Sequence, residues 1–169
     1  DMTYPEWKKS FVEDAISTQT RKEFAKYSEI LGNNPMTIGD FVKIKYNDEE
    51  WKLFKSFTSS IKSGELSALA DFNLYKNISD EMDVKLLGVV TSNGMTITGK
   101  SNHSIARVIG SIEQRRNGVQ VSDVLDALTS KEAEVLPIKI MKNGRSQKFR
   151  NNTVEVSVNP DNGNIIQVN

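Results

Sequence analysis

The C-terminal third of the chain, residues 135–169, constrains the fold most, because turn signals divide it into four short runs of alternating apolar and polar residues. The turn signals are Asn143-Gly144, Asn151-Asn152 and Asp161-Asn162-Gly163. Asn-Gly and Asp-x-Gly sequences supply the positive φ that tight turns between strands require. The sequence therefore predicts a four-stranded antiparallel sheet, with strands over about 135–141, 145–151, 153–159 and 164–168.

Successive side chains of a strand point to opposite faces of the sheet, which divides these residues into two sets. Val154, Val156 and Val158 are expected on the core face, together with Phe149. The other face would carry polar groups: Ser146, Lys148, Arg150, Glu155, Ser157 and Asn159. On the sheet alone, a solvated outer face is the preferred interpretation, because antiparallel sheets commonly have one face in water.

Composition sets the limits on domain number and on partners. The 169 residues suffice for one medium domain or two small ones. Residues 1–83 contain 11 Lys/Arg and 15 Asp/Glu, whereas residues 84–169 contain 11 and 7, so an acidic half precedes a basic half. This asymmetry favours two units, and a basic second unit is compatible with a polyanionic partner.

Several classes of site are excluded by residue counts. The chain has no cysteine and one histidine, so disulfides, thiolate metal sites and multi-histidine zinc sites are excluded, and no cofactor is expected. No apolar run is long enough to span a bilayer and no signal-peptide pattern opens the chain, so no membrane partner is expected. Because the sequence begins at Asp1 and ends directly after a strand pattern, we expect a piece of a longer polypeptide.

The first half of the chain, residues 1–80, predicts a helical unit. Helices are expected from the capping-box sequence at Thr3, over residues 18–31 with Gly32 at the end, from Thr37 through Ile44, after Asn47, and over about 66–76. Aromatic residues recur at helical spacing within these segments and are expected in the core rather than in a ligand site.

The second unit, residues 84–169, is predicted to be α+β. The apolar run Val84–Val90 and the segment Met95–Thr98 flank Ser92-Asn93-Gly94, which indicates a hairpin. A helix capped by Ser101 or Asn102 is expected to continue through Arg116, and a short one to begin at Ser122. The fold expected is thus two helices packed on a four-stranded antiparallel sheet.

Candidate chemistry centres on His103, the single histidine. His103 lies in the first turn of its expected helix and Arg107 follows one turn later, so both project from one side of that helix. Alone, a histidine at a helix start is more often a surface residue than a catalyst. Several cationic and hydroxyl side chains could surround one cleft together with His103, and they favour a catalytic site. These residues are Lys100, Arg107, Arg145, Ser146, Lys148 and Arg150.

These residue types suit metal-independent cleavage of RNA, whose 2′-hydroxyl is a nucleophile carried by the substrate. Such an enzyme needs a general base that works near neutral pH, for which histidine is the usual group, and fixed cations and donors on the phosphate. The acid for the leaving 5′-oxygen would be a lysine, Glu155 or a residue beyond Asn169. Cleavage of DNA fits less well, because the chain has no cluster of metal-binding carboxylates.

Two segments resemble known families. DMTYPEWKKSFV and KYSEILGNNPMTIGDFVKIKYNDEEWKLFK, within about residues 1–55, resemble the end of Mu F-like phage head morphogenesis proteins, which often carry variable C-terminal toxin domains. NHSIARVIGSIEQRRNGVQVSDVLDAL and GRSQKFRNNTVEVSVNPDNGNIIQV, within about residues 86–169, resemble phage toxin members of the barnase/EndoU/colicin/RelE-like ribonuclease superfamily.

The resemblance implies helices packed against a four-stranded antiparallel sheet with a catalytic site on its concave face. It implies cleavage of RNA, often tRNA, a cognate immunity protein as partner, docking of the N-terminal region on a phage capsid or portal, and a location in the virion or the bacterial cytoplasm. Matching positions for catalysis are His103, Arg107, Ser146 and Lys148. The substrate-binding candidates are Lys100, Arg145, Arg150, Ser157 and Asn159. Members of this group often have a hydroxyl residue just after the last strand, where this sequence stops at Asn169; either that residue lies beyond Asn169, or Ser157 or another group replaces it.

Three functions are compatible with these sequence features. The first is a phage-encoded ribonuclease toxin domain, which the sequence favours without deciding that the chain is an enzyme. The second is a non-enzymatic structural or interaction module of a minor head protein. The third is another hydrolase or transferase on a similar scaffold, for which the chain offers no Gly-rich phosphate loop, nucleophile elbow or metal-ligand pair.

Overall fold

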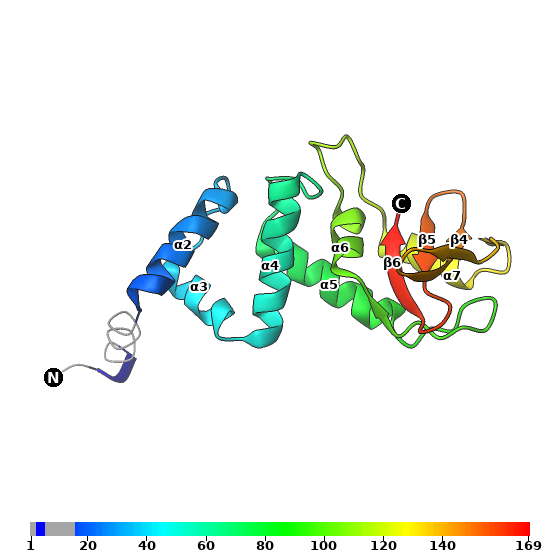
Figure 1. Cartoon of the computed structure of the whole chain (residues 1–169), viewed down its shortest axis with the longest axis horizontal. Helices are drawn as coiled ribbons and strands as arrows, with labels where there is room; N and C mark the ends of the chain where they lie inside the picture. Colours follow the sequence, from blue (N-terminus) through cyan, green and yellow to red (C-terminus); the bar gives the residue numbers. More distant parts are fainter. Residues whose placement is uncertain (1–2, 6–15) are drawn as a thin grey trace.

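The computed structural model describes residues 3–5 and 16–169 of the chain. The described part is an elongated α+β structure with helices at one end and a sheet near the C-terminus at the other (Figure 1). The helix predicted from Thr3 lies largely outside the described residues. Within the described residues, no helix is both long and apolar enough to cross a membrane.

Four helices form the N-terminal half from residue 16 onward, and their starts follow from capping residues. They are α2 (Thr18–Leu31), α3 (Ile38–Lys45), α4 (Asp48–Ser63) and α5 (Phe72–Leu86). The predicted caps are confirmed: Thr37 Oγ1 accepts from the N–H of Asp40, and Asn47 Oδ1 accepts from the N–H of Glu50, each at 3.2 Å. Gly32 ends α2 as expected.

The aromatic stripes of these helices form a core, as their spacing predicts. Trp51 stacks on Phe54 with ring centroids 5.8 Å apart, and Phe41 meets Phe54 edge-on at 6.0 Å. Phe54 also meets Phe72 of α5 at 5.2 Å. Edge-on and stacked pairs of this kind add to the free energy of area burial. The aromatic side chains of α2, α3, α4 and α5 therefore join the helices into one packed body.

The C-terminal half adds two helices, α6 (Asn102–Ile109) and α7 (Val121–Thr129), and a sheet. The strands are β1 (Gly99–Lys100), β2 (Glu134–Val135), β3 (Lys139–Met141), β4 (Gly144–Arg150), β5 (Glu155–Val158) and β6 (Asn164–Val168). The predicted antiparallel order is confirmed for β4, β5 and β6, with β2 and β3 both paired to β4.

The prediction of a four-stranded, purely antiparallel sheet is wrong in two respects. In the described chain the sheet has six strands, because the first predicted strand is divided at Pro137 into β2 and β3 and because β1 is added at the other edge. It is mixed, because β1 pairs in parallel with β6, with Lys100 opposite Ile165. A two-residue parallel strand leaves no periodic signal in a sequence, so nothing local predicted it.

The apolar run Val84–Val90 was wrongly predicted to be a strand. Its first residues belong to α5, where Leu86 is buried and Val84 is 83% exposed. The Ser92-Asn93-Gly94 turn is present, and backbone hydrogen bonds join Gly88, Val89 and Thr91 to Met95 and Ile97 across it, but its arms form only an isolated antiparallel bridge, Val90 to Thr96, and no strand. A short apolar run is compatible with either a strand or a helix, and tertiary packing decided for the helix.

Two predicted helices differ in length. The segment 66–76 is helical only from Phe72, and the resulting helix α5 is longer than expected. The helix predicted through Arg116 ends at Ile109, because Gly110 has a φ of 94° and its backbone passes directly against that of Gly118. Ile112 therefore lies beyond the helix and is exposed rather than buried in its apolar stripe.

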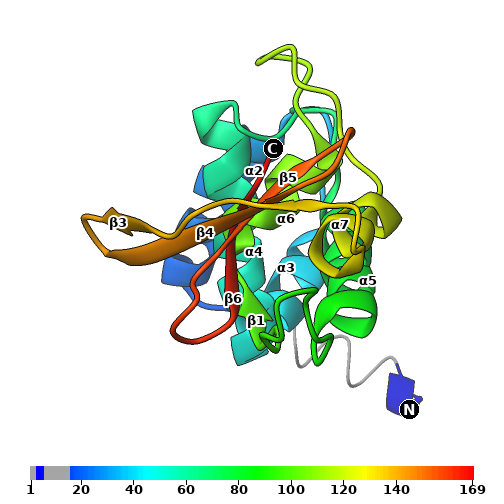
Figure 2. The ribbon, with the colours of Figure 1, turned by 90° about the vertical axis from the view of Figure 1, so that its right-hand side faces the viewer.

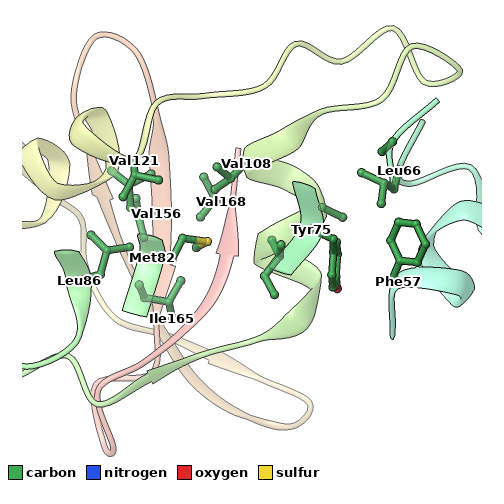
Figure 3. Close-up of a cluster of buried hydrophobic side chains, with 14 of the residues drawn as sticks. Phe57, Leu66, Tyr75, Met82, Leu86, Val108, Val121, Val156, Ile165 and Val168 are labelled. Atoms are coloured by element: carbon green, nitrogen blue, oxygen red, sulfur yellow. The ribbon is translucent and has the colours of Figure 1, made fainter. Parts of the chain in front are cut away.

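Buried residues from Leu31 to Val168 form one continuous hydrophobic cluster. Figure 3 shows Met82 and Leu86 of α5 beside Val156 and Ile165 of the sheet. The predicted boundary between units 1–80 and 84–169 falls inside α5, which packs against α4, α6 and α7. The division into two units stays a prediction.

Candidate functional site

His103 lies in the first turn of α6, whose start is fixed by three neighbours. Ser101 caps the helix and accepts from the N–H of Ser104 at 3.2 Å, while its own hydroxyl donates to the carbonyl of Ile166 in β6 at 2.6 Å. From α5, the hydroxyl of Tyr75 donates to the carbonyl of Asn102 at 3.3 Å. The position of the imidazole therefore depends on both the sheet and the helical half.

The partner of the imidazole is Glu65, in the turn after α4. His103 Nδ1 contacts Glu65 Oε1, and Arg107 Nε lies 3.7 Å from the same oxygen. The distance to Arg107 is too long for a hydrogen bond, so the guanidinium acts on Glu65 through charge alone. A carboxylate on Nδ1 fixes the orientation of an imidazole and leaves Nε2 available for proton transfer.

The turn that carries Glu65 is held by the loop 110–118. Ser111 Oγ donates to the carbonyl of Gly64 at 2.6 Å, and the N–H of Ala68 donates to Glu113 Oε1 at 3.1 Å. The guanidinium of Arg116 donates to the carbonyl of Glu65. Three contacts from one loop therefore determine where the Glu65 carboxylate lies.

The contacts around the loop 110–118 shift the pKa values of two of its charged side chains. Backbone hydrogen bonds, from the N–H groups of Glu113 itself and of Ala68, lower the pKa of the Glu113 carboxyl. Burial lowers the pKa of Arg116, and the positive charge of Arg107 adds to this effect. Glu65 offsets part of the repulsion between the two guanidiniums, because its negative charge acts on Arg116 in the opposite direction.

An open hollow of about 580 Å³ lies beside the imidazole, between α4 and the start of α6. It is lined by polar and cationic side chains: Lys52, Lys55, Ser56, Ser59, Asn102 and His103. The amide of Asn102 donates to Ser56 Oγ at 2.8 Å, which joins the two walls. Within the described chain, Nε2 of His103 has no hydrogen-bond partner, so it is the nitrogen available to a bound ligand.

The polar strand residues that the sequence singled out line a different hollow, of about 620 Å³, on the outer face of the sheet. The predicted residues among its lining are Arg145, Ser146, Lys148, Ser157 and Asn159. The register confirms a shared face for Ser146, Lys148 and Ser157, since it places Lys148 opposite Ser157, while Phe149 and Val156 pair on the buried face.

The expectation that His103 and the strand residues share one cleft is wrong. Helix α6 packs on β6 from the buried side, with Val108 beside Val168 (Figure 3), whereas Ser146 and Lys148 lie on the opposite side of the sheet. The alternation of residues along the strands correctly predicted which side chains lie on each face of the sheet. It does not indicate against which face α6 packs.

Three predicted substrate-binding cations are paired within the chain. Lys100, whose side chain is 9% exposed, forms an ion pair with Asp83 and lines neither hollow. Arg150 pairs with Glu134 at 2.8 Å and also lies outside both hollows.

Arg145 is the third of these cations and pairs with Asp161 at 2.6 Å. The hydrogen bond from the guanidinium lowers the pKa of the Asp161 carboxyl. Lys148, for comparison, lies 3.4 Å from Glu155.

Sequence reasoning missed Glu65, Lys52 and Lys55. Glu65 follows a glycine in a turn, and only the tertiary packing of loop 110–118 brings it to the imidazole. Lys52 and Lys55 lie on the polar side of an amphipathic helix, where lysines are usually solvated surface residues. The spacing of one helical turn between them is the single signal that could have indicated a shared cationic surface.

No group of three or more His, Asp or Glu side chains in the described part of the chain is arranged to hold a metal ion. Comparison of the chain with protein-family models, with curated proteins and with solved structures finds no match.

Proposed function

We propose that this chain is a metal-independent endoribonuclease whose catalytic hollow lies between α4 and α6. The observation that carries the proposal is the contact between Glu65 and His103 Nδ1 at the edge of a hollow that also contains Lys52 and Lys55. An oriented imidazole supplies a general base, and the two ammonium groups supply the positive charge that a phosphodiester requires. The family resemblance of residues 86–169 supports the same reaction class.

In this mechanism, His103 Nε2 takes the proton of a 2′-hydroxyl group. The 2′-oxygen then bonds to phosphorus while the bond from phosphorus to the 5′-oxygen breaks. The leaving 5′-oxygen takes a proton from water, which reaches the hollow because it is open to solvent. The products are a 2′,3′-cyclic phosphate and a free 5′-hydroxyl.

Negative charge on the phosphate increases in the transition state, so fixed cations accelerate the reaction more than they strengthen binding of the substrate. Lys52 and Lys55 have this role here, while Ser56 and Asn102 can donate to the non-bridging oxygens. Of the four residues proposed as catalytic from the sequence, His103 is in the hollow, and Arg107 acts on it through Glu65. Ser146 and Lys148 have no role in this mechanism.

The test is incubation of the purified chain with total tRNA in the presence of a chelator. We expect cleavage that leaves cyclic phosphate ends, and loss of at least about a hundredfold in rate for His103→Ala. Lys131→Ala, at an exposed lysine that lines neither hollow, serves as the matched surface variant and should cleave at the wild-type rate.

Equal cleavage by the His103→Ala protein would remove His103 from the mechanism. Intact RNA with the wild-type chain under all conditions would instead favour the non-enzymatic interaction module. A substrate with a single 2′-deoxy nucleotide at the cleavage position separates a true 2′-hydroxyl reaction from a hydrolytic one, since only the former is blocked.

A further inference from the structure

The edge of the sheet formed by β2 and β3 is open. Within the described chain, both strands pair with β4 on one side and with no strand on the other. Figure 2 shows the β3–β4 hairpin reaching beyond the described helices, so none of them covers β3. An open edge presents unpaired backbone N–H and C=O groups that can pair with another extended chain.

Apolar side chains are exposed along this edge. Ile140 is 88% exposed, and Ile138 and Met141 are also largely in solvent. Natural edge strands are commonly protected by lysine and proline, and here Pro137 and Lys139 precede Ile140. Pro137 has no N–H, so an added strand can pair with this edge only over Ile138–Met141 and the residues next to it.

The outer-face hollow lies along the same edge and is cationic. Its lining includes Lys139, Lys142, Arg145 and Lys148, and no acidic side chain. Arg145 and Lys148 already have carboxylate partners, whereas Lys139 and Lys142 form no ion pair with any described residue. The two lysines nearest the open edge are therefore the ones whose charge is not neutralised within the chain.

We propose that this edge binds an extended acidic segment of a partner protein, which adds to the sheet as a further strand beside β3. The pairing register of β3 with β4 determines which positions of the bound segment lie on each face of the sheet. Lys139 and Met141 face the hollow with Ser146, so Ile140 points to the other face. Side chains of the partner beside Lys139 and Met141 are then acidic, and those beside Ile138 and Ile140 are apolar.

A peptide strand fits this surface better than a nucleic acid. Single-stranded nucleic acid is usually bound on aromatic rings, and the residues that line the hollow include none. A nucleic acid also cannot pair with the backbone groups of a strand edge, whereas strand addition uses those groups for affinity and alternate side chains for specificity. The inference stands apart from RNA cleavage, since neither Lys52 nor His103 takes part in it.

Fluorescence anisotropy of a labelled, end-capped peptide of alternating glutamate and valine tests the proposal. Comparison peptides are the lysine–valine equivalent and a peptide of the same composition with its glutamates and valines in separate blocks. We expect binding of the alternating acidic peptide only, together with slower hydrogen exchange at the amides of residues 138–142. That protection distinguishes strand addition from attraction by charge alone.

Two variants and their controls test whether the peptide binds at the β3 edge. The double variant Lys139→Glu/Lys142→Glu should weaken binding at least about tenfold, because it places carboxylates beside those of the peptide. Ile140→Asp should weaken binding by a similar factor, whereas Lys131→Glu and Ile112→Glu, at exposed positions outside the hollow, should leave it unchanged.

Absence of peptide binding overturns the proposal. Binding of a uridylate oligonucleotide in place of the peptide, with the same dependence on Lys139 and Lys142, also overturns it and assigns the surface to nucleic acid. Peptide binding without protection of residues 138–142 rejects the strand-addition geometry.

Discussion

Glu65 contacts His103 Nδ1, and the positioning role proposed for it can be separated from a role in binding RNA. The Glu65→Gln variant keeps the shape of the side chain but removes its charge. We expect kcat to fall about a hundredfold or more, because the imidazole loses the carboxylate that orients it. Steady-state kinetics with a short RNA substrate measures the change.

Because Glu65 does not line the hollow, KM should change little in that variant. A rise in KM with unchanged kcat would contradict the positioning role and would indicate direct contact with substrate instead. The thermal unfolding midpoint of the variant controls for loss of structure.

Tyr75 makes stability depend on pH. Burial raises the pKa of the Tyr75 hydroxyl well above the ordinary tyrosine range, and the charge of Glu65 adds to this effect. In the unfolded chain, the hydroxyl ionises near its ordinary pKa of about 10, so the unfolded state binds fewer protons than the folded state above that pH. The contribution of Tyr75 to stability is thus fully present below about pH 10 and decreases above it.

Tyr75→Phe tests this dependence. We expect a loss of about 1 kcal/mol in the free energy of unfolding near neutral pH, from the missing hydrogen bond to the carbonyl of Asn102. Above about pH 10, the difference between the proteins should shrink by about 1.4 kcal/mol per pH unit, because only the wild type has this tyrosine to ionise. Urea unfolding across that pH range measures it, and parallel curves for the two proteins would contradict the account.

Among the elements, the turns show most clearly how local sequence and tertiary contact combine. Gly94 and Gly163 have φ values of 89° and 80°, in the left-handed region that glycine adopts without cost. A Cβ at Gly94 would meet nothing, whereas one at Gly163 would overlap the backbone oxygen of Thr96. The turn between β5 and β6 is therefore packed against the segment that follows α5.

The two glycines form a matched pair for substitution. Gly94→Ala should lower the free energy of unfolding by about 1–2 kcal/mol, from the backbone conformation alone. Gly163→Ala should cost about 1–3 kcal/mol more, because the chain must also shift to relieve the overlap. Equal losses in urea unfolding would show that the contact with Thr96 has no effect on stability.

The elements that the sequence predicted well are those with local signals. Caps at Thr37 and Asn47 and turns at Gly144 and Gly163 lie where expected, because each is specified by a side chain and its immediate neighbours. Val84–Val90 was misassigned because an apolar run carries no period. The helix after Ser101 was predicted too long because the close approach of Gly110 and Gly118 is a tertiary contact.

In the whole molecule, the outer-face hollow and the hollow beside His103 are separate, whereas the sequence predicted a single cleft. The alternation of β4 and β5 gave the polar face correctly, down to Lys148 and Ser157. Local pattern does not specify the face of the sheet to which α6 binds, nor that a turn after α4 brings Glu65 to His103. The candidate site was therefore only half predictable: the imidazole was identified, but its partner and its hollow were not.

Because the two hollows are separate, removing lysine charges from one hollow should not change ligand binding at the other. Lys52→Gln/Lys55→Gln should weaken RNA binding and reduce the slope of log affinity against log salt by about one per lysine, because each ammonium releases a counterion from the phosphates. Lys139→Gln/Lys142→Gln is the matched pair on the other side of the sheet and should leave both quantities unchanged. Equal effects of the two double variants would contradict two separate hollows.

The most direct test of the account follows the single histidine by NMR, since the chain gives one set of imidazole signals. A 2′-O-methyl oligonucleotide binds like RNA but lacks the free 2′-hydroxyl, so it can be titrated without cleavage. The account predicts that the His103 ring signals shift on binding, along with the amides of Lys52 and Lys55. Unchanged ring signals, with shifts confined to Ser146, Lys148 and their neighbours on the sheet, would contradict it.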